Sequence, residues 1–435
     1  MPYTVGIYTL GCKVSQYESI AISEGFEALG FTVLPFEEEC DVYVINTCTV
    51  TAESDRKCRQ IIRRAAKRTG IVIVCGCYSQ VSPDEVSKID GVLYIVGNYN
   101  KNRIPETALR LLSDGGKKAG ASPILDIPDI DTCGFERMCI HKAPRTRVYV
   151  KIEDGCESRC TYCIIPSARG RIRSKAPEDI LSEVEGLAAS GVKEVVLTGI
   201  ETASYGRDLE NIRLIDIIES VAKIEGISRI RLGSLDPSSI TEDLVVRASK
   251  VDKLAHHFHL SMQSGSSTVL ARMKRKYNAE QALRKIALIR EYMPDSAFTT
   301  DMMVGFPSET EEEFEQTQEF AKKAEFLFMH IFPYSRRKGT PAAEYGGQIP
   351  EPVKHSRAAQ LSEVRDAVAE KVREKLAPAG SVHEVLFETF EKGYIKGHTS
   401  NFIEVSAPCN DDLRGDIRKV IITDNSRATV MGKII

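Results

Sequence analysis

The chain of 435 residues lacks any run of apolar residues long enough to cross a bilayer, and it contains no low-complexity tract. The first residues also lack the basic start, apolar stretch and small-residue cleavage site of a signal peptide. Net charge is small, because 58 basic residues stand against 61 acidic ones. We therefore expect a cytoplasmic protein without a membrane partner, in which any nucleic-acid partner would meet local basic patches.

Cysteine, by contrast, is plentiful, with 12 residues. A reducing cytosol keeps thiols free, so clustered cysteines indicate a metal site and scattered ones indicate core positions, rather than a disulfide framework. The length exceeds what one hydrophobic core usually organises, which predicts two or three domains.

The pattern of strands and helices predicts an α/β protein with a β-rich end. Up to about residue 110, short β-branched runs alternate with helical patterns, which indicates a parallel sheet covered on both faces. After an irregular, Gly- and Pro-containing stretch, about six further strand-helix units predict a closed or partly open barrel. Strand-like runs alone follow residue 382, and these indicate a small all-β barrel. We place the domains at residues 1–115, 142–375 and 376–435, with a linker at 116–141.

Three cysteines near the first barrel strand, in VYVKIEDGCESRCTYCIIPSARGR, are close enough to bind one metal group. Thiolates are the usual ligands of iron-sulfur clusters, and three of them would leave the fourth iron of a 4Fe-4S cluster open. A structural zinc site is the alternative, but it would normally need a fourth Cys or His, and residues 155–175 contain none.

This segment resembles the radical S-adenosylmethionine superfamily. Its CxxxCxxC loop is matched by Cys156, Cys160 and Cys163, and Tyr162 is the aromatic residue before the last ligand. The resemblance implies that the open iron binds S-adenosylmethionine and that the three cysteines are catalytic. It also implies a 5′-deoxyadenosyl radical that abstracts hydrogen, with the protein positioning the reactants and excluding water.

Three further cysteines lie in the first domain, where Cys12, Cys48 and Cys77 each follow a predicted strand. We call them the first set, because they come first in the chain, and we call the three on the loop the second set. The carboxyl ends of parallel strands share one edge of a sheet, so these residues can meet and bind a second open cluster. The alternative is a core role, because free cysteine is among the most buried residue types.

The motifs TLGCKVSQYES, INTCTVTAESDRKCRQ and GCYSQ resemble the amino-terminal domain of the methylthiotransferases. The resemblance implies two 4Fe-4S clusters, with Cys77 rather than Cys75 completing the first set. The terminal GYIKGHTSNFIEV is similar to a TRAM domain, an RNA-binding β-barrel, so the likeness covers almost the whole chain.

Within the family, RLGSLDP and HLSMQSGSSTVLARMKRKY are most similar to the MtaB type. This implies methylthiolation of C2 of N6-threonylcarbamoyladenosine at tRNA position 37, with S-adenosylmethionine as radical source and methyl donor. An external electron donor and a sulfur source are also implied. The alternatives are methylthiolation of N6-isopentenyladenosine and a non-enzymatic iron-sulfur RNA-binding protein, although ferredoxin-type clusters use four cysteines each.

Matching positions in the family imply a cofactor-binding set at the ends of the barrel strands: Tyr162, Thr198, Gly199, Glu201, Ser234 and Gln263. Ser234 and Gln263 could instead cap helices or satisfy backbone groups. Two residues depart from the MtaB pattern, since Ser15 and Glu201 stand where Asn is common. Asp301 is expected to bind substrate or cofactor, or to lie at a helix start.

Four groups of basic residues are candidates for phosphate contacts, although a solvated helix face is the alternative for each run. They are residues 56–68, Arg169 to Lys175, Arg272 to Lys276, and Arg336 to Lys338.

Overall fold

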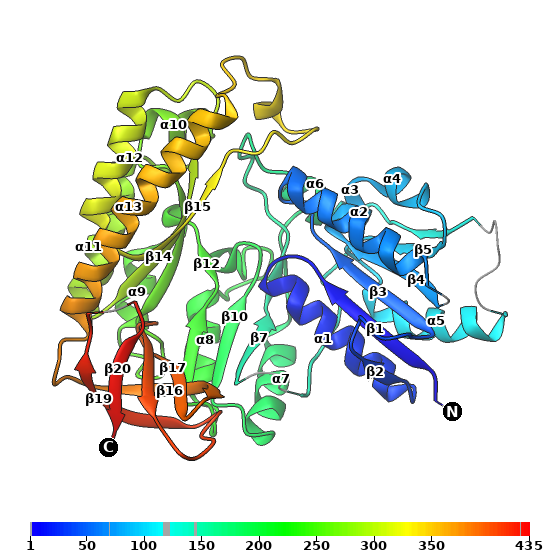
Figure 1. Cartoon of the computed structure of the whole chain (residues 1–435), viewed down its shortest axis with the longest axis horizontal. Coiled ribbons are helices and arrows are strands. Elements are labelled where there is room, and N and C mark those ends of the chain that lie inside the picture. Colours follow the sequence, from blue (N-terminus) through cyan, green and yellow to red (C-terminus); the bar gives the residue numbers. More distant parts are fainter. Residues whose placement is uncertain (1, 69, 116–121, 143–145, 427) are drawn as a thin grey trace. The chain divides into compact units, whose positions relative to one another are not determined.

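The computed structural model describes residues 2–68, 70–115, 122–142, 146–426 and 428–435. Contacts divide the chain into two compact units, one made of residues 1–142, 151–176 and 335–340, and the other of residues 143–150, 177–334 and 341–435 (Figure 1). Both units therefore combine segments that are distant in the sequence. The boundaries placed along the sequence stay a prediction, and residues 116–121 of the expected linker lie outside the described residues.

A parallel six-stranded sheet organises the first unit, in the order β2-β1-β3-β4-β5-β6. Its strands are β1 (Thr4–Thr9), β2 (Thr32–Leu34), β3 (Val42–Thr47), β4 (Ile71–Gly76), β5 (Val92–Val96) and β6 (Ile124–Asp126). The helices are α1 (Lys13–Ala28), α2 (Ala52–Ala66), α3 (Cys77–Val81), α4 (Pro83–Ser87), α5 (Ile104–Ser113) and α6 (Ile165–Arg169), and a short pair is formed by β8 (Glu153–Asp154) and β9 (Arg173–Ser174).

The expected parallel sheet is confirmed, and its central strands show why the sequence predicts it. Every residue of β3, β4 and β5 is buried, which suits strands covered on both faces and explains their continuous apolar runs. The strand β6 lies in the stretch expected to be a linker. It has only three residues, too few for an alternating pattern to register.

Two sheets and a closed barrel form the second unit. One sheet has the order β11-β10-β7, the other has the order β12-β13-β14-β15, and the barrel is β16-β17-β18-β20-β19. The strands are β7 (Arg147–Lys151), β10 (Glu194–Thr198), β11 (Arg229–Leu232), β12 (Ser234–Leu235), β13 (His257–Gln263), β14 (Ala297–Val304), β15 (Phe326–Pro333), β16 (Val382–Glu391), β17 (Tyr394–Thr399), β18 (Glu404–Pro408), β19 (Ile417–Asp424) and β20 (Val430–Ile434).

The helices of this unit are α7 (Pro177–Ala189), α8 (Leu214–Ala222), α9 (Glu242–Ala248), α10 (Ser267–Arg272), α11 (Ala279–Tyr292), α12 (Glu311–Ala324) and α13 (Glu351–Leu376). In Figure 1, α11, α12 and α13 cover one face of the four-stranded sheet. The second unit has the alternating strands and helices that the sequence predicts, with the strands divided between two sheets, so the α/β class with a terminal all-β barrel is confirmed.

The small terminal barrel shares its core with the larger domain. Val368 and Val372 of α13 pack in one apolar cluster with Leu327 of β15 and with the inward side chains Val385 and Phe387 of β16. Among the aromatic residues of this barrel, Phe387 is fully buried and Tyr394 is 44% exposed.

A buried polar contact accompanies this apolar core. Glu194 is bound by the guanidinium groups of Arg229, at 3.2 Å, and Arg231, at 2.9 Å. Arg231 also donates to the carbonyls of Thr399 and Ser400, so one group of charges joins β10, β11 and the turn after β17. Burial would raise the pKa of Glu194, but the two guanidinium groups outweigh it and lower the pKa.

Phe402, in the same turn, has a φ of +69° and stacks between two imidazoles. Its ring centroid lies 4.5 Å from that of His257 and 4.6 Å from that of His398, and the guanidinium of Arg231 lies 4.8 Å from the ring centroid. Phe402 therefore attaches the terminal barrel to β13 through the His257 ring and to β11 through the Arg231 guanidinium, whereas His398 belongs to β17 of the barrel itself.

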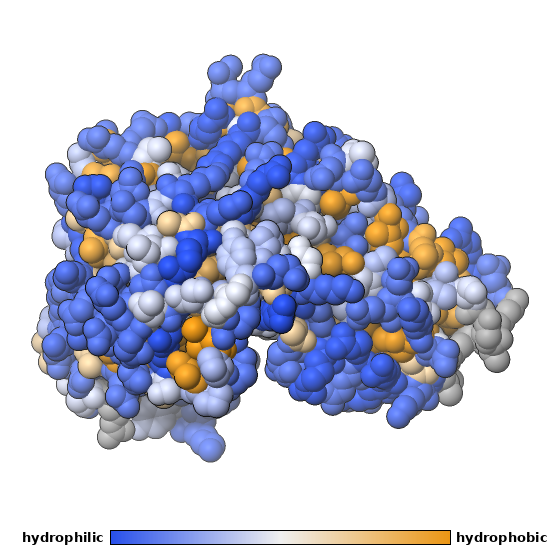
Figure 2. Space-filling model, turned by 90° about the horizontal axis from the view of Figure 1, so that it is seen from above, coloured by the Kyte–Doolittle hydropathy of each residue, from blue (hydrophilic) through white to orange (hydrophobic). Residues whose placement is uncertain are grey.

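The surface is mostly polar. Figure 2 shows a face on which hydrophilic residues predominate and hydrophobic residues form small separate groups. Among the described residues, no helix combines the length and the apolar character needed to cross a membrane.

We expect Phe402→Ala to lower the free energy of unfolding of the second unit by about 3 kcal/mol, because it removes a ring packed on both faces. Chemical denaturation followed by circular dichroism would measure this loss. Tyr394→Ala is the matched control, since that ring is 44% exposed, and its cost should stay under about 1 kcal/mol. Equal effects of the two substitutions would contradict the role of Phe402.

Candidate active site

The first set of cysteines lies at the carboxyl ends of three neighbouring strands. Cys12 precedes α1 and follows β1, Cys48 directly follows β3, and Cys77 begins α3 directly after β4. Because β1, β3 and β4 are adjacent and parallel, their ends share one edge of the sheet, as the sequence predicts. Burial, with smaller contributions from the neighbouring Cys77 and Cys12, raises the pKa of the Cys48 thiol to about 11.

The thiol of Cys77 has a buried polar neighbour that the sequence did not indicate. Asn98 donates from Nδ2 to Cys77 Sγ at 3.3 Å, and its Oδ1 accepts from Lys101 Nζ at 2.9 Å. Asn98 also donates to the carbonyl of Ala168, next to Arg169. A hydrogen bond from an amide to a sulfur ligand orients that ligand and tunes a bound metal centre.

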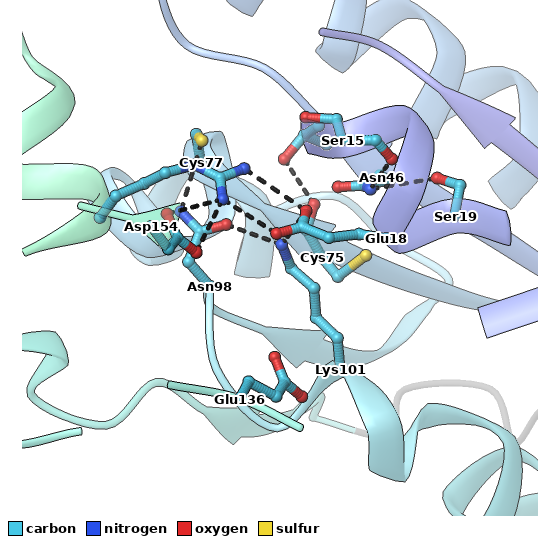
Figure 3. Close-up of polar contacts among 12 residues, drawn as sticks. Ser15, Glu18, Ser19, Asn46, Cys75, Cys77, Asn98, Lys101, Glu136 and Asp154 are labelled. Atoms are coloured by element: carbon cyan, nitrogen blue, oxygen red, sulfur yellow. Dashed lines mark hydrogen bonds and ion pairs between the residues drawn. The ribbon is translucent and has the colours of Figure 1, made fainter. Parts of the chain in front are cut away.

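Lys101 belongs to a buried group of five charges, which we call the charge network: Glu18, Lys101, Lys151, Asp154 and Arg169 (Figure 3). Glu18 lies at its centre, with Lys101 Nζ at 2.5 Å, Lys151 Nζ at 2.9 Å and Arg169 Nη1 at 2.9 Å. All five side chains of the charge network are at most 4% exposed. A charge this deeply buried is tolerated only when it is fully paired.

The electrostatics of the charge network follow from this pairing. Burial would raise the pKa of Glu18, but Arg169, Lys101 and Lys151 outweigh it and hold the pKa well below its usual range. Burial would also raise the pKa of Asp154, and Arg169, Lys151 and Arg173 lower it instead. Both carboxylates are therefore charged, and with three cations the network carries a net positive charge beside Cys77.

This environment suits an iron-sulfur cluster, which is rich in negative sulfur. Cys12, Cys48 and Cys77 form no disulfide, so their thiols are available as ligands. In the described part of the chain, the buried Nε of Arg169 has no hydrogen-bond acceptor. Burial would lower the pKa of Arg169, but Asp154 and the other groups around its guanidinium outweigh it and raise the pKa. Cys12, Cys48 and Cys77 would hold the cluster, and Arg169 would face it as a donor. Among the described residues, no group of three His, Cys, Asp or Glu side chains is arranged so that it could hold a single metal ion.

The second set of cysteines lies on one loop between β8 and α6. Cys156 N donates to the carbonyl of Gly170, and Ser158 N lies 3.4 Å from Cys156 Sγ. Cys163 N donates to the carbonyl of Cys160 at 3.1 Å, which closes a turn around the central ligand. Three thiols on one loop, with one backbone N–H directed at the thiol of Cys156, fit a cluster with an open iron.

The cofactor-binding residues expected in the second unit lie at strand ends. Thr198 ends β10, Ser234 begins β12 and Gln263 ends β13 with a φ of +69°, an unusual backbone for a non-glycine residue. Gly199 directly follows Thr198. These assignments stay predictions, as does that of Tyr162, which lies in the cysteine loop of the first unit.

Glu201, which departs from the family pattern, is held by the backbone. Its Oε1 accepts from the N–H of Asp236 at 3.0 Å, which brings the β10 and β12 ends together. Burial raises the pKa of Glu201 to about 7, and the nearby Asp236 contributes to the rise. The carboxyl group can therefore hold or release a proton near neutral pH.

Several basic residues expected to contact phosphate are buried instead. Arg169, Arg173 and Lys175 are at most 4% exposed. Arg337 is 7% exposed and donates to Asp55 and Thr49. These residues pair with the protein itself, so the expectation was wrong for them. The basic residues Arg56, Arg59, Arg63 and Arg64 of α2, together with Lys67 directly after the helix, line one surface pocket and remain candidates.

Comparisons with known proteins agree with these features. Residues 150–321 match the Radical SAM superfamily, and residues 4–97 match "Uncharacterized protein family UPF0004". The threonylcarbamoyladenosine tRNA methylthiotransferase MtaB of Bacillus subtilis is 38% identical over 430 residues, which cover 96% of this chain and 93% of the relative. The tRNA-2-methylthio-N(6)-dimethylallyladenosine synthase of Caldicellulosiruptor saccharolyticus is 33% identical over 443 residues, covering 99% and 92%.

A solved structure shares the fold at lower identity. The radical S-adenosylmethionine methyltransferase TsrM from Kitasatospora setae matches with a TM-score of 0.58 and 17% identity, covering 79% of this chain and 77% of that one.

A radical S-adenosylmethionine barrel preceded by the UPF0004 domain defines the class of enzyme. The chain belongs to the tRNA methylthiotransferase family. Enzymes of this family use S-adenosylmethionine and 4Fe-4S clusters, which confirms the expected cofactors and excludes a purely non-enzymatic role.

The charge network was not predicted from the sequence, although the position of Glu18 gave one indication of it. Glu18 lies on the buried face of α1, in step with Val14 and Ile22 at intervals of four residues. A carboxylate at such a position must have buried cationic partners. Their identity could not be read from the sequence, because Lys151 and Arg169 are more than 130 residues away.

We expect Glu18→Gln to lower the free energy of unfolding of the cluster-free protein by about 3 kcal/mol at pH 7, because it leaves buried cations without a charged partner. The pKa of Glu18 is lower in the folded state, so its contribution is present above the unfolded pKa of about 4.3 and is lost as pH falls. The variant should therefore lose less stability than the wild type between about pH 5 and pH 3, as measured by urea denaturation.

Glu27→Gln is the control on the same helix, since Glu27 forms an exposed pair with Lys142. Its cost should stay under about 1 kcal/mol. A pH dependence of Glu18→Gln identical to that of the wild type would show that Glu18 is not held charged.

Gly155, directly before the first loop cysteine, cannot be replaced without moving the loop. Its φ is +90°, and an added Cβ would lie 1.9 Å from the carbonyl oxygen of Arg171. We expect Gly155→Ala to lower the iron content by half, from about eight to about four irons per chain, through loss of the second cluster alone. Iron and sulfide analysis would measure this. Gly134→Ala is the control, because its Cβ would meet nothing within 4 Å, and it should keep all the iron.

Proposed function

We propose that the enzyme methylthiolates C2 of N6-threonylcarbamoyladenosine at position 37 of tRNA, next to the anticodon. The choice of this nucleoside rests on the sequence identity to two groups of relatives. Three with the MtaB name are 36–38% identical, whereas relatives named as dimethylallyladenosine synthases are 33–34% identical. Dimethylallyladenosine, called isopentenyladenosine above, remains the second candidate substrate, because the relatives named for it match 99% of the chain.

The residues of the chain divide the work between two sites. Cys156, Cys160 and Cys163 hold the cluster with the open iron, and Cys12, Cys48 and Cys77 hold the other. When bound, the clusters and S-adenosylmethionine supply the radical chemistry, the sulfur and the methyl group. Tyr162, Thr198, Gly199, Glu201, Ser234 and Gln263 bind and orient S-adenosylmethionine. An electron donor and a sulfur source outside the chain are also required.

Two features of the structure support tRNA as the partner. The row of basic side chains on α2 offers phosphate contacts on a chain whose overall charge is near zero. The closed five-stranded barrel at the carboxyl end has the form expected of a TRAM domain. We place the reaction in the cytoplasm, in keeping with the tRNA-modifying relatives.

The test is to quantify 2-methylthio nucleosides by mass spectrometry in tRNA from a strain lacking the gene, with and without its restoration. We expect the wild-type gene to restore the threonylcarbamoyl species. Cys163→Ala and Cys77→Ala should each abolish it, because each removes a ligand of a different cluster.

Cys409→Ala is the matched control, since Cys409 lies in the terminal barrel, outside both cysteine sets, and it should restore the nucleoside fully. Return of the isopentenyl species alone would overturn the proposed substrate while leaving the family unchanged.

A further inference from the structure

Three ionisable side chains lie side by side across the four-stranded sheet of the second unit. His259, Asp301 and His330 come from β13, β14 and β15, and in the strand register Asp301 is opposite His330. His259 Nε2 lies 3.3 Å from Asp301 Oδ2, and His330 Nδ1 lies 3.4 Å from Asp301 Oδ1. We call these residues the His-Asp-His group. Asp301 therefore lies inside a strand, which excludes the helix-start role considered for it.

The His-Asp-His group lies on a face of the sheet where His330 is exposed. On β15, Leu327 and Met329 are buried, and Leu327 packs in the apolar cluster with residues of α13. The alternate residues Phe328 and His330 are exposed, the side chain of His330 by 68%. Since successive side chains of a strand point to opposite faces, His330 lies on the face opposite that of the buried Met329, and its side chain is accessible there.

The charges on this face are ordered by Asp301. Burial would raise the pKa of Asp301, but the contacts from His259 and His330 outweigh it and lower the pKa. The contact with Asp301 in turn raises the pKa of His330. Asp301 binds one side of the His330 ring, and among the described residues no partner reaches Nε2 on the other side. The group thus presents an oriented, positively biased donor to whatever lies on this face.

Aromatic rings flank this donor on the same strand. The ring centroid of Phe332 lies 5.5 Å from that of His330, and Phe328 carries the guanidinium of Arg365 at 5.6 Å from its ring centroid. A row of rings suits a flat base, which stacks on aromatic side chains whatever its hydrogen-bonding edge. A cation between such rings suits a base that carries an anionic substituent.

We propose that the His-Asp-His group, through His330 Nε2, binds the carboxylate of an amino-acid substituent on the target adenine, with Phe328 and Phe332 flanking the base. This inference rests on the proposed function and adds to it the residue that selects the substituent. A hydrocarbon substituent has no charge for His330 to bind, so it gains nothing from this contact. His330 is therefore a specificity residue, and Asp301 and His259 position it.

The test compares two synthetic anticodon stem-loops that differ in one group. One carries threonylcarbamoyladenosine, and the other carries its methyl ester, which keeps the size and removes the charge. Affinities for the anaerobic holoenzyme with S-adenosylmethionine are measured by fluorescence anisotropy. We expect the wild type to bind the carboxylate form at least about tenfold more tightly than the ester, the scale of one charge-assisted hydrogen bond.

His330→Phe should bind both stem-loops with equal affinity, because it keeps a ring and removes the donor. His355→Phe is the matched control, since His355 is an exposed imidazole on α13 and should keep the wild-type ratio. A His330→Phe variant that keeps the ratio, or a wild type that shows no preference, would overturn the inference.

Methylthiolation of the same stem-loops separates this inference from the proposed function. If the wild type modifies only an isopentenyladenosine stem-loop, the proposed function fails. If it modifies the threonylcarbamoyl stem-loop while His330→Phe keeps the carboxylate preference, the function stands and the role of His330 fails.

Discussion

The ion pairs between Glu18 and its three buried cations are the interaction on which the candidate site depends most. Glu18 belongs to α1, Lys151 to β7, Asp154 to β8 and Arg169 to the end of α6, so a few charges connect four elements. The loop that carries the second cysteine set begins directly after Asp154 and leads into α6. Asn98, bound to Lys101, contacts Cys77 of the first set. Both sets of cysteines are thus positioned by one group of side chains.

Because the charges of this network are buried, each of them depends on the others being in place. A carboxylate removed from water is stable only while its cations stay in place, and the same holds for each cation. Such a group contributes little net stability compared with apolar packing, but it permits few alternative arrangements. Its net positive charge also lies where two clusters rich in negative sulfur are expected, so the cost of burying the cations is partly offset when the clusters bind.

The second unit uses buried charge in a different way. Glu194 with Arg229 and Arg231 joins the sheet to the terminal barrel, and Phe402 packs against the same arginine. Apolar packing on α13 completes the junction. The sheet of β13 to β15, in contrast, leaves His330 exposed beside aromatic rings, which is the arrangement of a binding surface rather than of a core.

The sequence by itself determined the parts of this protein that depend on local spacing. Cys156, Cys160 and Cys163 lie on one loop, so their proximity could be predicted. The buried strands β3 to β5 could also be predicted, because each is a continuous apolar run. Short elements such as β6 could not, because three residues carry no period. The burial of Arg169, Arg173 and Lys175 could not be predicted either. A basic residue is expected to be exposed unless its buried partner is known. Only the tertiary structure decided that the strands before Cys12, Cys48 and Cys77 are direct neighbours, that Glu18 meets Arg169, and that Asp301 lies between two histidines. The physical reason is that strand order and register, which no local pattern encodes, bring these distant residues together.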